Sequence, residues 1–137
     1  MHKTAPALIL AALLSYVATV AARQDATHDT TSVKQVMVTM TIPASDVIFT
    51  AASEPPKDEQ TWRDVRKSAL VLTDSGELLL TGRLAKDNTT WMDMARAMVA
   101  QTQVTLKAID AKDLDALAQA ADDMYVTCKA CHDRYME

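Results

Sequence analysis

The stretch LDALAQAADDMYVTCKACHDRY, Leu114–Tyr135, decides the fold expected for this chain. Its apolar side chains recur at alternating steps of three and four residues, which brings them onto one face of an α-helix. This row consists of Leu114, Leu117, Ala121, Met124, Cys128, Cys131 and Tyr135. Such a row is typical of a helix in a bundle. Asp110 is expected to cap the start of this helix, with Asp113 in its first turn.

Three earlier stretches show the same alternation, so we expect four helices. They run from Val33 to Ala51, from Trp62 to Leu79 and from Trp91 to Ile109, and residues 88–90 are expected to cap the third. The chain of 137 residues has only two glycines and one phenylalanine, a composition that favours helices over a sandwich or barrel. Short links between the helices predict an all-α, antiparallel up-down-up-down four-helix bundle.

The first stretch is the least regular of the four. Residues 36–42 also alternate as a strand would, but the apolar pattern continues past Ala51, too far for an ordinary strand. Pro43 falls inside the expected helix and should kink it or interrupt its hydrogen-bond ladder. The apolar face expected for this helix contains Val33, Met37, Met40, Ala44, Val47 and Ala51.

Both cysteines of the chain lie in one motif, Cys128-Lys129-Ala130-Cys131-His132. A CxxCH run is typical of the attachment of c-type haem, in which each thiol forms a thioether with a haem vinyl group and the histidine binds the iron. Residues three and four apart share a helix face, so Cys128, Cys131 and His132 can address one porphyrin. We therefore expect one covalent haem c near the C-terminus of the last helix. Because the apolar row passes through both cysteines, the haem should lie against the bundle interior.

Two other kinds of site also use this motif. A dithiol redox pair of the thioredoxin type would need a βαβ unit around the cysteines, and the helical pattern offers none. A zinc site would need four ligands, and the only other histidines, His2 and His28, lie near the N-terminus. The sequence therefore favours haem over both alternatives.

A histidine alone leaves one axial position of the iron open, and a methionine thioether binds haem iron well. In the antiparallel bundle, the end of the last helix lies beside the start of the first, near Ser32. At 1.5 Å per residue, His132 lies about 4.5 Å from its helix end, and Met37 and Met40 lie about 7.5 and 12 Å from their helix start. Met37 is therefore the predicted second axial ligand, with Met40 in reserve. The expected pocket wall contains four further methionines, Met92, Met94, Met98 and Met124.

The first 22 residues have the pattern of a cleavable signal peptide. A short basic segment at the start precedes an apolar run at 5–22 that is rich in small residues. This run ends in the sequence VAA, which fits a cleavage site for signal peptidase. This run is near the lower limit for a membrane span, so a retained anchor is the alternative to cleavage after Ala22. Residues 23–31 are expected to form a disordered tail, and residues 32–137 the four-helix domain. Export would place the mature protein in the periplasm, with no stable membrane insertion.

These features resemble the class II c-type cytochromes, the family of cytochrome c′ and its low-spin relatives. The shared features are an exported four-helix chain, a CxxCH motif close to the C-terminus, and Tyr135 three residues after His132. The resemblance covers Ser32 to Tyr135. It implies that Cys128 and Cys131 carry the thioether bonds and that His132 is the proximal iron ligand.

The same resemblance bears on the other side of the haem. In low-spin members a methionine of the first helix binds the iron and stands six residues before a proline, as Met37 stands before Pro43. Many relatives have a basic residue four after the histidine, where this chain has Met136. Under this resemblance, Arg134 is expected to interact with the haem propionates in place of that basic residue. Relatives often dimerise through their first two helices, which makes a homodimer possible.

Three functions follow from these expectations, and electron transfer is favoured. A Met/His-ligated iron suits an electron carrier that is not an enzyme, since it has no open site for a substrate and would exchange electrons with redox partner proteins. A five-coordinate iron would instead bind nitric oxide or carbon monoxide. The third function is thiol-disulfide exchange at Cys128 and Cys131. The net charge of −4 argues against nucleic acid as a partner.

Overall fold

The computed structural model describes residues 31–136. The signal peptide predicted at residues 1–22 lies outside the described residues, and so does all but the last residue of the tail predicted at 23–31. Residues 32–137 form one unit of mutual contacts, with its boundary between Thr31 and Ser32.

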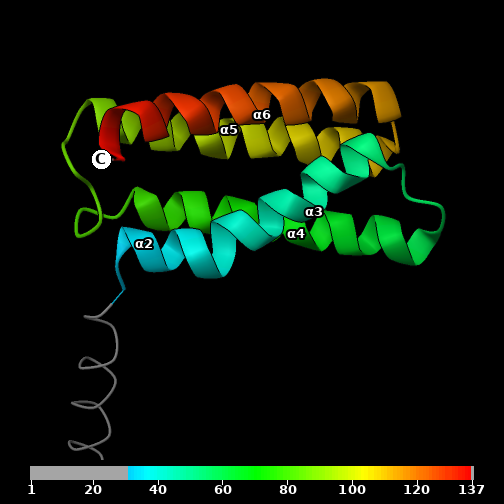
Figure 1. Cartoon of the computed structure of the whole chain (residues 1–137), viewed down its shortest axis with the longest axis horizontal. Helices are drawn as coiled ribbons and strands as arrows, with labels where there is room; N and C mark the ends of the chain where they lie inside the picture. The colour runs from blue at the N-terminus through cyan, green and yellow to red at the C-terminus, as the bar shows by residue number, and fades with distance from the viewer. Residues whose placement is uncertain (1–30, 137) are drawn as a thin grey trace, which may run out of the picture. The chain divides into compact units, whose positions relative to one another are not determined.

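Four helices pack against one another in an all-α bundle, as predicted (Figure 1). The first is a continuous helix from Val33 to Ser53. It is made of α2 (Val33–Val36), η1 (Met37–Thr41) and α3 (Ile42–Ser53). The others are α4 (Glu59–Leu79), α5 (Thr90–Ala111) and α6 (Leu114–Tyr135). Sequence neighbours pack together, and α3 closes the bundle by packing against α6. No strand forms within residues 31–136.

The residue that caps α6 lies three residues after the predicted one. Asp110 is not its cap, because α5 continues to Ala111 and Asp110 accepts a hydrogen bond from Arg66 at 2.7 Å. Lys112 ends α5 in the left-handed conformation, with φ of 51°, and the chain reverses at once. Asp113 then caps α6 by accepting the Ala116 backbone N–H at 3.0 Å.

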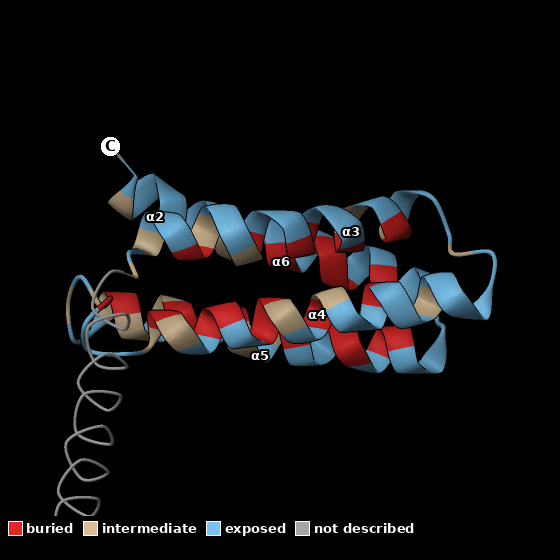
Figure 2. Cartoon of the chain, turned by 90° about the horizontal axis from the view of Figure 1, so that it is seen from below, coloured by how far each residue is buried: buried red, intermediate tan, exposed pale blue. Residues whose placement is uncertain are grey.

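The interior of the bundle contains most of the apolar residues expected for α4, α5 and α6, as Figure 2 shows by colour, but Leu114 at the start of α6 is exposed. Ile48, Leu72 and Leu117 are completely buried, one from each of three helices. Buried hydroxyl groups such as that of Thr102 bond to backbone carbonyls of their own helix. Among residues 31–136, no buried side-chain nitrogen or oxygen lacks a hydrogen-bond partner.

Shortening Leu117 should destabilise the bundle strongly. Leu117 is completely buried in the core, so Leu117→Ala removes buried methyl groups and leaves a cavity, at a cost of about 2–5 kcal/mol in the free energy of unfolding. Leu114 lies on the same helix but is 42% exposed, so Leu114→Ala should change that free energy by less than about 1 kcal/mol. Chemical denaturation of both variants measures the difference, and equal losses would contradict the assigned core.

The first helix accommodates Pro43 by forming a π turn just before it. Pro43 has no backbone N–H to donate and its ring crowds the preceding turn. The helix widens just before it, at Met37–Thr41, where the N–H of Ile42 donates to the carbonyl of Met37 five residues back. The predicted interruption is therefore present, and it takes the form of one inserted residue.

This insertion overturns part of the apolar face predicted for the first helix. Val36, Thr41, Ala44, Ile48 and Ala51 are buried. Met40 is only half-buried and Val47 is 38% exposed. The expected spacing assumed a uniform helix, and the extra residue of the π turn rotates the face that meets the core.

By length and composition, Val33–Ser53 could cross a membrane. About a third of its most apolar window is buried inside the bundle. Since α3 packs against both α4 and α6, the bundle core accounts for that part of its apolar character.

Candidate functional site

The first helix and α6 diverge at the end of the bundle that holds the CxxCH motif (Figure 1). The α3 segment packs against both α4 and α6, whereas α2 and η1 pack against α4 but not against α6. The π turn and Pro43 lie where this divergence begins. The local geometry of the first helix therefore separates it from α6 beside the motif.

A cavity of about 280 Å³ lies in this region, and all four helices contribute to its wall. The first helix supplies Met37, Thr41, Ile42, Ser45 and Phe49. The next two helices supply Leu79, Trp91, Met94, Ala95 and Met98. The last helix supplies Tyr125, Thr127, Cys128, Lys129, Cys131 and His132. Most of these side chains are apolar, so the cavity suits a large apolar group that is fixed by a few polar contacts.

The three CxxCH residues line this cavity together. Cys128 and Cys131 are half-buried, and both pack against the core cluster. His132 contributes to the wall although the residue as a whole is exposed. The motif lies within the regular part of α6, which continues to Tyr135. The i, i+3 and i+4 spacing thus presents two thiols and an imidazole to one space, as the attachment of a porphyrin requires.

The two thiols do not have the character of a reactive dithiol pair. Burial raises the pKa of the Cys128 thiol, and the neighbouring Cys131 raises it further. Burial also raises the pKa of Cys131. Catalytic dithiols need the opposite, a lowered pKa that provides the thiolate nucleophile. The raised pKa values therefore do not favour thiol-disulfide exchange.

The two methionines considered as second ligand lie in different places. Met37 lines the cavity that Cys128, Cys131 and His132 also line. Met40 lines a separate hollow between the first helix and α4. Iron ligation by Met37 remains a prediction, but of the two candidates only Met37 shares a cavity with His132.

Of the other four methionines predicted for the pocket wall, two line the cavity and two do not. Met94 and Met98 line the cavity, as expected. Met124 is completely buried in the core and does not line it. Met92 packs against the core cluster and is also outside the cavity wall. Side chains that the helical spacing did not single out, such as Phe49 and Tyr125, complete the wall.

Charged side chains near the motif are paired. Lys129 lines the cavity and donates to Asp133 at 2.5 Å. Arg134 does not line the cavity; its guanidinium lies 5.6 Å from the ring centre of Tyr135. Nε of Arg134 donates to the Tyr135 hydroxyl at 3.3 Å. Lys129 is therefore nearer than Arg134 to any acidic group held at the rim of this cavity.

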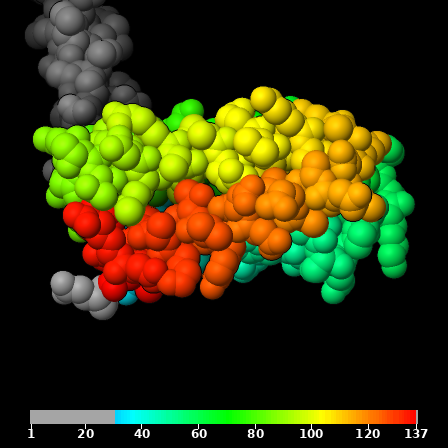
Figure 3. Space-filling view, turned by 90° about the horizontal axis from the view of Figure 1, so that it is seen from above, coloured from blue at the N-terminus to red at the C-terminus, as the bar shows by residue number. Residues whose placement is uncertain are grey.

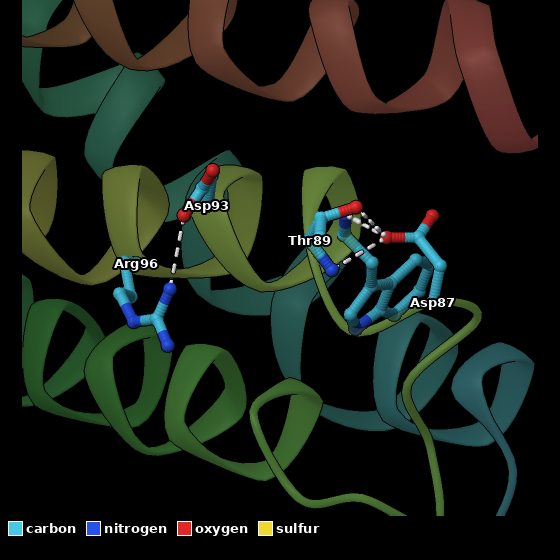
Figure 4. A network of polar contacts seen from close by, with 5 residues as sticks. Asp87, Thr89, Asp93 and Arg96 are labelled. Atoms are coloured by element: carbon cyan, nitrogen blue, oxygen red, sulfur yellow. Dashed lines mark hydrogen bonds and ion pairs between the residues drawn. The ribbon is translucent and has the colours of Figure 1, made fainter.

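Sequence reasoning missed Asp87, which joins the end of α6 to the start of α5. The N-cap residue of α5 is Thr89, within the expected residues 88–90, but its side chain makes no capping bond. Oδ1 of Asp87 instead accepts the backbone N–H groups of Thr89 and Trp91, each at 3.0 Å (Figure 4). Its Oδ2 accepts a hydrogen bond from the Tyr135 hydroxyl. Figure 3 shows the end of α6 lying beside the segment that leads into α5. No periodic pattern marks this contact, because 48 residues separate its partners.

These contacts give a pH dependence. The Tyr135 hydroxyl, followed by the Trp91 and Thr89 N–H groups, lowers the pKa of Asp87 from its usual 3.8 to about 2. A lowered pKa means that the folded state favours the carboxylate, so its stabilising effect is complete above about pH 4 and is lost as the pH falls toward 2. The unfolding midpoint of Asp87→Asn should therefore depend less on pH than that of the wild type in this range. Denaturation curves between pH 2 and 5 measure this, and parallel pH dependences would contradict it.

A bare metal ion has no evident site in the described part of the chain. No group of three or more histidine, cysteine, aspartate or glutamate side chains within residues 31–136 could hold one. A zinc site built on Cys128, Cys131 and His132 would need a fourth ligand. The motif and its apolar cavity fit a haem better than an isolated ion.

Comparison with known proteins agrees with the geometry. Residues 83–136, which include all of α5 and α6, match the protein family described as Cytochrome C'. No curated protein and no solved structure matches the chain. The matched segment contains Asp87, the CxxCH motif and Tyr135. This match covers 54 of the 137 residues and, together with the four-helix bundle, supports a class II c-type cytochrome of the cytochrome c′ family, which implies a haem cofactor.

Proposed function

We propose that the protein is an exported electron carrier with one haem c, attached through Cys128 and Cys131, whose iron is bound by His132 and Met37. The observation that carries this proposal is that these four side chains line one cavity, although Met37 lies about 90 residues before the motif. The family supports a c-type haem protein that transfers electrons or binds a gas. The covalent bonds and the second ligand are the further steps proposed here.

The protein residues would hold and shield the group. A bound haem supplies a one-electron change at its iron, and the protein sets its ligands and surroundings. The apolar part of the wall, with Phe49, Leu79 and Trp91, would shield the bound group from water. His132 and Met37 come from two helices that pack in the same bundle, so neither ligand needs to move when the charge on the iron changes.

The wider setting of the function is also a proposal. Thioether haem is attached outside the cytoplasm in bacteria, so the chain is expected to act in the periplasm after removal of residues 1–22. A redox partner protein would exchange electrons at the haem edge, near exposed wall residues such as Tyr125 and Lys129. The net charge of −4 does not favour nucleic acid.

One observation favours gas binding as a second candidate. Met37 lies in the π turn, where one residue is inserted and the regular hydrogen-bond pattern changes. A ligand carried on such a turn could leave the iron more readily than one on a regular helix. The iron would then be five-coordinate and open to nitric oxide or carbon monoxide within an apolar cavity.

Optical spectra of the purified, natively matured protein separate the two functions. A low-spin oxidised spectrum with a sulfur-to-iron charge-transfer band supports the electron carrier. A high-spin oxidised spectrum, with rapid binding of carbon monoxide after reduction, supports the gas binder. A protein without any haem absorbance would contradict both.

A further inference from the structure

The proposed iron ligand His132 lies in the last turn of α6, where a helix has fewer backbone hydrogen bonds than in its middle. The last four carbonyls of a helix lack the N–H partners that a further turn would supply, and helix ends fray. The carbonyl of His132 still accepts the N–H of Met136 at 2.9 Å, and Met136 is the residue at which α6 ends. Helix propensity alone therefore does not fix the direction of the imidazole, and a contact from outside α6 is needed.

That contact is made by Tyr135, three residues after His132 and therefore on a neighbouring part of the helix surface. The Tyr135 ring packs edge-on against Trp91, with 5.1 Å between ring centres and 73° between planes. Trp91 is itself held, because its indole N–H donates to the carbonyl of Leu79 at 2.7 Å. The last turn of α6 is thus packed against a side chain that α4 and α5 fix in place.

Asp87 adds a directional bond to this packing. Its Oδ1 accepts from the backbone N–H groups of Thr89 and Trp91 and from the Thr89 hydroxyl at 3.3 Å (Figure 4). Its Oδ2 remains for the Tyr135 hydroxyl. The carboxylate lies at the N-terminus of α5, where the helix dipole favours a negative charge. A hydrogen bond to a carboxylate is shorter and stronger than one between neutral groups.

We propose that Asp87 is a positioning residue for the haem iron, which acts through Tyr135 to fix the orientation of His132. This inference rests on the proposed function, because it requires His132 to bind iron. Groups that orient a metal ligand typically change affinity or activity by 10–100-fold when they are removed. Asp87 would act one contact further from the iron, because it bonds to Tyr135 and its carboxylate does not line the cavity.

The test compares haem-loaded variants by electron paramagnetic resonance of the oxidised protein and by reduction potential. Tyr135→Phe removes one hydroxyl and keeps the ring against Trp91, so the fold should survive. Asp87→Ala removes the carboxylate. Both should retain covalent haem but should show at least a tenfold larger fraction of iron in a second ferric species, with a shifted potential. Asp87→Asn should restore one species, since its amide oxygen can accept both N–H groups and its amide nitrogen can donate to the Tyr135 oxygen.

Asp93→Ala provides the matched control. Asp93 lies in the first turn of α5, pairs with Arg96 at 2.9 Å on the exposed surface and is outside the cavity wall (Figure 4). If Tyr135→Phe and Asp87→Ala give the same resonance and potential as Asp93→Ala, the Asp87 contact is only structural and the inference is wrong.

The wild-type protein separates failure of this inference from failure of the proposed function. Wild-type protein without covalent haem would overturn both. Wild-type protein with five-coordinate iron would overturn the role of Met37 alone. The variant comparison would still decide the role of Asp87 in that case, because His132 binds the iron in either function.

Discussion

Replacing both Cys128 and Cys131 by serine is expected to abolish haem that survives a denaturing gel. Each thiol is proposed to form one thioether bond, and serine cannot form it. Both cysteines line the same cavity within one turn of α6, so no other side chain can replace them. Haem staining and mass spectrometry of protein matured with the export and haem-attachment machinery measure the loss directly.

The single variants sharpen this prediction. Cys128→Ser and Cys131→Ser should each retain one thioether and give a lower yield of haem-loaded protein. The two cysteines are the only ones in the chain, so no other thiol can compensate. If the double variant still stains for haem after denaturation, the covalent attachment proposed here is wrong.

Met37→Ala is expected to convert the oxidised iron from low spin to high spin. The substitution removes the only first-helix thioether in the cavity wall and leaves His132 in place. Met/His ligation raises the reduction potential, and axial ligands set haem potentials over ~0.8 V, so the potential should fall by about 100 mV or more. Optical spectra and a redox titration measure both effects.

Met40→Ala is the matched control for this variant. Met40 lies three residues later on the same π turn, but it lines a separate hollow beside α4. Its removal should leave the spectrum and the potential close to those of the wild type. A low-spin spectrum retained in Met37→Ala would exclude Met37 as a ligand, and a spin change in Met40→Ala alone would restore the reserve candidate.

The helices that pack regularly could be predicted from residue spacing. In α6, the alternation of three and four residues placed Leu117, Ala121 and Met124 in the core, where the structure has them. This succeeds because the period of a regular helix decides which side chains share a face, independently of the rest of the chain. Over the first helix the same reasoning placed Ala44 and Ala51 correctly but was wrong for Val47, because the π turn inserts a residue and rotates the face.

Within the candidate site, contacts inside one helix could also be predicted from the sequence, whereas contacts between helices could not. The grouping of Cys128, Cys131 and His132 on one helix face follows from their spacing within a single turn and was determined by the sequence alone. The tertiary structure decided which methionine reaches their cavity, since that depends on how a π turn and Pro43 direct the first helix away from α6. It also decided that Asp87 meets Tyr135, because a contact across 48 residues depends on how helices pack and has no period along the chain.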